Sequence, residues 1–156
     1  MWRPLISNLP VRCRLLSSTA PPVTVPSSPA NISYAELGVQ YELQIQAFLS
    51  QTLGIRTRHI GGRADGGVAL RGEWPLPPHT LTPDNKTPII HNVIVQCKNI
   101  TNKCPPNTVR ELEGVLARQP GNLGILACTR PASDLARHRL HASTLPILFV
   151  MVPFGD

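Results

Sequence analysis

Apolar positions repeat at two different spacings along this chain, one typical of helices and one typical of strands. Leu37, Tyr41, Ile45 and Leu49 recur at helical spacing, directly after the capping-box pattern Ser33-Tyr34-Ala35-Glu36. In such a box a hydroxyl accepts from a free helix N–H and a carboxylate reaches back to the cap. Gly54 then supplies a stop signal, so the pattern predicts a helix from about Ser33 to Leu53.

Three shorter apolar stretches follow, with the alternation and the β-branched residues that favour strands. They predict strands at Ile55–Ile60, Val68–Trp74 and Ile89–Cys97, and the last is expected at the centre of a sheet. A glycine-rich turn separates the first two, and the Pro-rich stretch Pro75–Pro88 predicts a loop before the third.

The C-terminal half alternates helix and strand signals. Thr108 and Glu111 have the spacing of a second capping box, and the apolar stripe Val109, Leu112 and Leu116 predicts a helix that ends near Pro120. The remaining elements are predicted as a strand, a helix and a strand at Leu123–Thr129, Ser133–His141 and Pro146–Val152. The resulting order, α-β-β-β-α-β-α-β, predicts an α/β domain.

Composition separates the N-terminal segment from this domain. The first 35 residues contain three arginines and many serines but no acid, and the first carboxylate is Glu36. This composition is typical of mitochondrial targeting segments, because a negative-inside potential draws in positive charge and opposes acids. We therefore interpret residues 1–32 as a targeting segment with a Pro- and Ser-rich linker, and 33–156 as the folded domain. A disordered basic tail is the alternative; our interpretation predicts a mitochondrial location, in the matrix.

Charge, hydropathy and cysteine content exclude some classes of protein, namely membrane-spanning, disulfide-rich and zinc-ribbon proteins, and leave nucleic-acid binding open. The formal charge is +6, from 15 basic and 9 acidic residues, and it falls to +3 (12 − 9) without the three N-terminal arginines. A mildly basic domain permits nucleic-acid binding without arguing for it. No apolar run approaches the roughly 20 residues of a membrane-spanning helix. Four cysteines without a CxxC pair predict neither a disulfide framework nor a zinc ribbon.

Two segments suggest chemistry: the glycine-rich stretch Gly61–Gly72 and the strand end Val93–Lys98. Gln96 and Lys98 are expected on one strand face, because alternate residues of a strand share a face. A lysine ending an apolar strand is costly unless water or a partner reaches it. Each segment alone has an ordinary explanation, a strand that leaves the sheet at Lys98 and a hairpin turn rich in glycine.

Taken together and in this order, the segments resemble the Mrr-like branch of the PD-(D/E)xK nuclease superfamily. The closer resemblance is to the mitochondrial "required for respiratory growth" family. It is carried by Glu42 in Tyr41-Glu42-Leu43, the Gly61–Gly72 stretch, Gln96-Cys97-Lys98 and Glu111-Leu112-Glu113-Gly114. The resemblance implies a restriction-endonuclease-like αβββαβ core with a mixed central sheet flanked by helices.

The resemblance also implies a chemistry, Mg²⁺-dependent cleavage of phosphodiester bonds in DNA. It places Gln96 and Lys98 at the catalytic strand end and Glu42 as a helix acid and metal ligand. The family's metal-binding Asp, however, falls on Ala69, and a methyl group cannot bind Mg²⁺. Asp65 is left with two interpretations, a turn residue or a ligand that has moved. The resemblance therefore implies an endonuclease-type site that is weak or inactive.

Arginines near these motifs offer a nucleic-acid surface. Arg56, Arg58 and Arg63 lie close in sequence, and Arg71 is expected on the facing strand. They either follow a phosphate backbone or form a solvated basic strand face. Our first hypothesis is a protein that binds nucleic acid, DNA first, in mitochondrial genome maintenance or respiratory growth. The alternative is a non-catalytic interaction or assembly factor that retains only the fold.

Overall fold

A computed structural model describes residues 33–60, 67–76 and 89–154 of this chain. Its elements, in chain order, are α1 (Tyr34–Leu53), β1 (Arg56–His59), β2 (Leu70–Leu76), β3 (Ile89–Lys98), α2 (Pro106–Ala117), β4 (Asn122–Cys128), α3 (Asp134–Ala142) and β5 (Ile147–Met151). The predicted order of helices and strands is confirmed, and α1 to β4 give the αβββαβ order that the nuclease resemblance implies.

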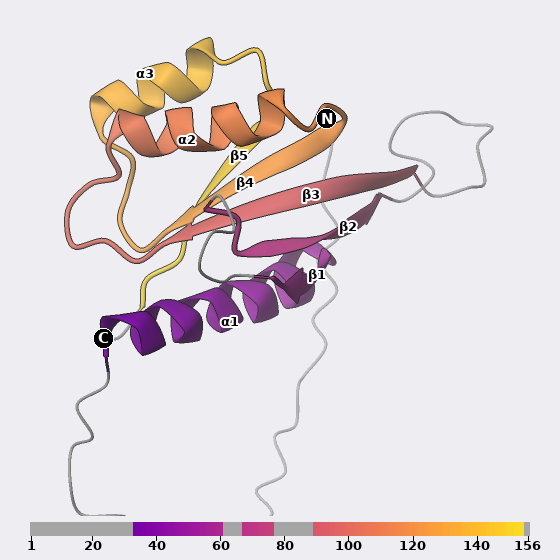
Figure 1. Cartoon of the computed structure of the whole chain (residues 1–156), viewed down its shortest axis with the longest axis horizontal. Coiled ribbons are helices and arrows are strands. Elements are labelled where there is room, and N and C mark those ends of the chain that lie inside the picture. The colour runs from indigo at the N-terminus through magenta and orange to yellow at the C-terminus, as the bar shows by residue number, and fades with distance from the viewer. Residues whose placement is uncertain (1–32, 61–66, 77–88, 155–156) are drawn as a thin grey trace, which may run out of the picture. The chain divides into compact units, whose positions relative to one another are not determined.

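The five strands form one mixed sheet in the order β1-β2-β3-β4-β5. The β1–β2 and β2–β3 pairs are antiparallel, whereas β3–β4 and β4–β5 are parallel. Helix α1 lies on one face of the sheet, and α2 and α3 lie on the other (Figure 1). This is the predicted α/β class with a mixed central sheet flanked by helices. None of the helices in the described ranges is long and apolar enough to cross a membrane.

Helix α1 begins and ends at the predicted signals. The Ser33 hydroxyl accepts from the Glu36 N–H, and the Glu36 carboxylate accepts from the Ser33 N–H, which is the predicted capping box. Gly54 ends the helix at φ 67°, a left-handed conformation that glycine adopts without strain.

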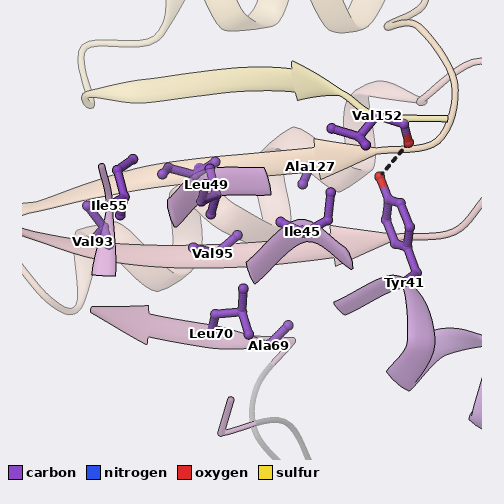
Figure 2. Close-up of a cluster of buried hydrophobic side chains, with 11 residues drawn as sticks. Tyr41, Ile45, Leu49, Ile55, Ala69, Leu70, Val93, Val95, Ala127 and Val152 are labelled. Carbon is purple, nitrogen blue, oxygen red and sulfur yellow. Dashed lines mark hydrogen bonds between the residues drawn. The ribbon is translucent and has the colours of Figure 1, made fainter. Parts of the chain in front are cut away.

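Two apolar clusters, one on each face of the sheet, form the core. The α1-side cluster lies between α1 and the sheet (Figure 2), and its buried members are Tyr41, Ile45, Leu49, Ile55, Ala69, Leu70, Val93, Val95, Ile125, Ala127 and Val152. The α2-side cluster contains Val68, Ile94, Cys104, Val109, Leu112, Val115, Leu116, Leu126, Cys128 and Ala136. The buried Tyr41 hydroxyl donates to the Val152 carbonyl at 3.2 Å and ties α1 to the segment after β5.

Two predicted boundaries are wrong for identifiable reasons. Helix α2 begins at Pro106, because proline at the first helical position has the right φ and needs no N–H partner. Thr108 therefore lies inside the helix and is buried, and no side chain caps this helix. Strand β2 extends through Pro75, which was assigned to a loop. Proline has no backbone N–H to donate to a neighbouring strand. The β1–β2 pairing stops at Glu73, so no residue of β1 lies opposite Pro75 and needs that N–H.

Candidate nucleic-acid interface

Gln96 and Lys98 meet at the end of β3 as predicted, and the residue that joins them is Glu111 of α2. The Lys98 Nζ lies 2.9 Å from the Glu111 Oε2, and the Gln96 Nε2 donates to the same oxygen at 3.1 Å. Glu111 was predicted to cap α2. Its carboxylate instead binds an ammonium and an amide from β3, and we call this contact the Gln96–Lys98–Glu111 triad.

Hydrogen bonds immediately after β3 hold the triad's strand end in place. Thr129, which follows β4, accepts from the Ile100 N–H at 2.9 Å and donates to the Ile100 carbonyl at 2.7 Å through the same hydroxyl. The chain then turns back, and the Cys104 N–H donates to the Pro131 carbonyl at 2.9 Å. These bonds fix the exit of β3, so Lys98 leaves the sheet directly beside α2.

Gln96 is the most deeply buried member of the triad. Gln96 is only 2% exposed, and its Oε1 has no hydrogen-bond partner within the described residues. A β-carbon at Gly67 would lie 3.0 Å from the Gln96 Nε2, so the glycine there makes room for the amide. Lys98 and Glu111 are more open, with side chains 33% and 48% exposed. The triad therefore has a fixed buried end and an accessible charged end.

Glu42 is not part of this triad. Its carboxylate binds the His59 Nε2 of β1 at 2.5 Å, on the side of the sheet that α1 covers. His59 pairs with Leu70, a member of the α1-side cluster, whereas Gln96 and Lys98 reach α2 on the other side. The structure thus brings two of the predicted site residues together and places Glu42 with a histidine that the sequence did not single out.

The remaining expected ligand positions supply no carboxylate within the described ranges. Ala69 is 4% exposed and packs in the α1-side cluster with Leu70, whereas Val68 belongs to the α2-side cluster. Strict alternation does not hold here, because β2 begins only at Leu70. Asp65 lies outside the described residues, as does Arg63.

These side chains do not fit a Mg²⁺ ion. Mg²⁺ needs near-octahedral oxygen ligands, and a dication is held by uncompensated carboxylates. Glu111 is already neutralised by Lys98, and Glu42 is engaged by His59. Within the described ranges, no three His, Cys, Asp or Glu side chains lie close enough to hold a metal ion.

Arginines gather on the part of the sheet that α2 leaves open. Arg56 and Arg58 of β1 pair with Glu73 and Arg71 of β2 respectively. Together with Asn92 and Asn122 they line an open hollow of about 560 Å³. Arg71 pairs with Ile94, and Ile94, Gln96 and Lys98 alternate on one face of β3. The arginines and the triad therefore share a face of the sheet. Arg71 lies level with Ile94, four residues before Lys98, which is a separation of about 13 Å along β3 at about 3.3 Å per residue.

The pairing of Arg58 with Arg71 is the unusual feature of this face. Like charges directly opposite each other in a sheet destabilise it. The Arg71 Nη1 donates to the Gln119 Oε1 at 2.7 Å, an acceptor without charge, and Arg56 lies 3.9 Å from the exposed Glu73. Arg58 is exposed and forms no ion pair within the described residues. Arg58 and Arg71 therefore carry two like charges opposite each other without a carboxylate partner within the described residues.

Three cysteine thiols near the triad have shifted pKa values, and the hydrogen bond with Cys104 together with burial raises the pKa of Cys128. Burial, with Glu42 adding a smaller effect, raises the pKa of Cys97. A hydrogen bond from Cys128 lowers the pKa of Cys104, with Thr108 and the Lys98 ammonium acting in the same direction and burial and the Glu111 charge opposing them. Both Cys104 and Cys128 are fully buried, so they act as packing residues of the α2-side cluster. Trp74 likewise packs against the α1-side cluster rather than presenting its ring on the basic face.

The sequence matches a family model over almost all of the described domain. The model is described as "Required for respiratory growth protein 7", and it matches residues 33–92 and 82–155. A comparison with curated proteins finds no match.

Among solved structures, the fold is similar to two restriction endonucleases. MspJI, in complex with a 27-mer oligonucleotide, is 21% identical over 75% of this chain with a TM-score of 0.49. The DNA modification-dependent endonuclease AspBHI is 16% identical over 81% of this chain with a TM-score of 0.48. The chain spans 25% of the first and 37% of the second.

Proposed function

We propose, from the premise that this chain belongs to the Required for respiratory growth protein 7 family, that it binds nucleic acid in the mitochondrial matrix. The partner is DNA, held on the face of the sheet that carries Arg56, Arg58 and Arg71. The role is in genome maintenance or respiratory competence, and the triad's Lys98 extends the same surface.

The observation that carries this proposal is the direct opposition of Arg58 and Arg71 in the β1–β2 ladder. A phosphate backbone, with one charge per ≈ 1.7 Å of duplex axis, removes the repulsion between two such arginines. Asn92 and Asn122 in the same hollow add neutral polar side chains that can donate to phosphate oxygens. The positive hollow favours nucleic acid over a neutral protein surface.

We further propose that the protein binds without efficient cutting. The ancestral activity implied by the resemblance needs carboxylates around a metal, yet the chain has Ala69 at the expected Asp, and its triad carries one carboxylate balanced by one ammonium. Asp65 is the other acid predicted in the site, and a metal site in this chain would need its carboxylate as a further ligand. Binding and cutting are therefore separable for this chain.

Anisotropy titrations of the full chain with labelled DNA test the binding proposal. Replacing both Arg58 and Arg71 by Gln is expected to weaken binding by at least tenfold and to make log K less steep in log salt by about 1.8, for two lost phosphate contacts. Arg137→Gln is the matched control, because this exposed arginine on α3 pairs only locally with Asp134. Equal weakening by the control would contradict the proposed face.

Divalent-metal titrations with supercoiled and linear DNA test the absence of cutting. Wild type is expected to leave both substrates intact with Mg²⁺ or Mn²⁺. An Asp65→Asn variant serves as the comparison, and calorimetry with the metal alone gives a second readout. Metal binding by wild type that is lost in Asp65→Asn would show that Asp65 completes the site.

One observation favours the alternative, an interaction or assembly factor. The outer side of α1 carries a strip of exposed apolar residues at i, i+4 spacing, namely Ala35, Val39, Leu43 and Ala47. Val39 and Leu43 are 45% and 50% exposed. If wild type binds no DNA while Leu43→Glu disrupts a mitochondrial complex, the alternative replaces the first proposal.

A further inference from the structure

We infer that Gln96 and Lys98 form an anion site, that the Glu111 carboxylate fills it in the free protein, and that a phosphate oxygen takes its place. The inference rests on the proposed function only for the source of that phosphate. It gives Gln96 the role of an N–H donor rather than of an oxygen ligand for metal, and it gives Glu111 the role of an internal competitor.

The geometry of the triad is that of an occupied anion site. One oxygen, the Glu111 Oε2, accepts from two donors that belong to the same strand face, the Lys98 Nζ at 2.9 Å and the Gln96 Nε2 at 3.1 Å. An ammonium and an amide N–H₂ converging on one oxygen is a donor pair suited to a phosphoryl oxygen. The amide orientation follows from this contact, because the flipped amide would set its oxygen against the carboxylate.

Burial of Gln96 makes an empty site costly. Its Oε1 already lacks a partner, and the loss of Glu111 would leave the Nε2 unpaired as well. A buried polar group without a partner is destabilising. The departure of Glu111 is therefore favoured when another acceptor arrives, and an anionic acceptor suits the site best because it also pairs with the released Lys98 ammonium. The exchange thus couples the departure of Glu111 to the arrival of the ligand.

Exposure of the two charged groups makes the exchange possible. The Glu111 and Lys98 side chains are 48% and 33% exposed, so the displaced carboxylate can turn into solvent. Ion pairs this exposed contribute little to stability. The anion site lies on the same face as Arg58 and Arg71, so one phosphate backbone can reach both.

The test compares two acids of the same helix in the full-length protein. Glu111→Gln removes one carboxylate and frees Lys98, whereas Glu113→Gln removes one carboxylate and frees Arg139, its partner on α3. Glu111→Gln is expected to tighten binding of a labelled DNA about three- to fivefold beyond the effect of Glu113→Gln, since it removes the competitor. In a Lys98→Gln background this extra gain is expected to vanish. Equal gains in the two variants, or a gain that persists without Lys98, would overturn the inference.

A second measurement separates this inference from the proposed function. The side-chain amide signals of Gln96 in ¹H–¹⁵N spectra are followed while inorganic phosphate is added. They are expected to shift at lower phosphate concentration in Glu111→Gln than in wild type or Glu113→Gln. Absence of any shift in Glu111→Gln refutes the anion site, even where DNA binds. A shift without DNA binding supports the anion site and refutes only the proposed function.

Discussion

The two faces of β3 are built from one stretch of sequence but end differently. On the face toward α1, Val93 and Val95 are buried and Cys97 continues the apolar row. On the face toward α2, the buried Ile94 is followed by Gln96 and Lys98. One face therefore stays apolar along the strand, while the other changes from core to polar site within a few residues.

The helices account for this difference. Helix α1 packs under β1 and the central strands with three fully buried side chains, Tyr41, Ile45 and Leu49. Helix α2 covers the opposite face beside β4 and leaves the β1–β2 part open, where Arg58 and Arg71 lie. Both faces carry a buried apolar cluster, but only the α2 face also carries the triad and the open arginines. If the proposed function is right, substitutions in the α1-side cluster change stability without changing DNA affinity, and the predictions below begin with that difference.

The largest expected effect is on the α1 face. Leu49→Ala should lower the free energy of unfolding by about 2–5 kcal/mol, because it opens a cavity in the α1-side cluster where Leu49 is 0% exposed. Leu43→Ala, on the same helix but 50% exposed, should change it by less than about 0.5 kcal/mol. Urea denaturation measures both. DNA affinity at a temperature where the variant is folded should be unchanged; a weakened affinity would break the division between the faces.

The second largest effect is expected from Gly72→Ala, because a β-carbon at this position would collide with the backbone of β1, the strand that carries Arg56 and Arg58. A β-carbon at Gly72 would lie 1.9 Å from the Arg56 carbonyl oxygen and 2.7 Å from the Thr57 Cα, and backbone atoms cannot move aside cheaply. We expect a loss of about 1–3 kcal/mol together with weaker DNA binding, since β1 carries Arg56 and Arg58. In Gly124→Ala the nearest atom is the Leu116 Cδ1 at 2.6 Å, a flexible side-chain end. This control should retain DNA affinity, and a loss of affinity there would contradict the prediction.

The sequence predicted the fold well because the signals are local. The capping residues Ser33 and Glu36 mark the start of α1, and Gly54 marks its end. The run of β-branched residues before Gln96 predicts the central strand. The second capping box was wrong, because Pro105 and Pro106 set the start of α2 before Thr108 could cap it. A spacing rule does not reveal which of two competing start signals prevails.

The site was predictable only in part, because it joins distant segments. Gln96 and Lys98 follow from strand alternation, but their partner Glu111 comes from α2 and was assigned to a cap. A usable signal was present: the Glu-Leu-Glu-Gly motif places two acids on the helix after a strand that ends in lysine. The pairing of Glu42 with His59 had no such signal, since it depends on how α1 crosses β1.

A smaller effect is expected from the hydrogen bond that joins Tyr41 and Val152 inside the α1-side cluster. Tyr41→Phe removes the hydroxyl that donates to the Val152 carbonyl, in a residue that is 1% exposed. We expect a loss of about 1 kcal/mol, because a buried acceptor loses its partner while the ring packing is kept. Tyr34→Phe is the control, since Tyr34 is 94% exposed and should show no change in thermal denaturation. Equal loss in both variants would show that the hydroxyl contact contributes nothing.

The smallest expected effect concerns how α3 is held on α2, and it depends on pH. Burial acts to raise the pKa of Glu113, but bonds from Arg139 and Ser143 outweigh it, so the pKa lies below its ordinary value. Arg139 donates to the Glu113 Oε2 through Nε at 2.8 Å and Nη2 at 2.6 Å. A carboxyl with a lowered folded pKa stabilises fully above its unfolded pKa, about 4.3, and this stability is lost as pH falls through the folded pKa. Glu113→Gln should therefore be less stable than wild type by up to about 1 kcal/mol at pH 7, and the gap should close in the acid range. Urea denaturation of both proteins at pH 7 and at a pH below about 4 measures this difference in unfolding free energy. A difference that stays constant into acid would show that the packing of the Glu113 side chain, and not its charge, holds α3 in place.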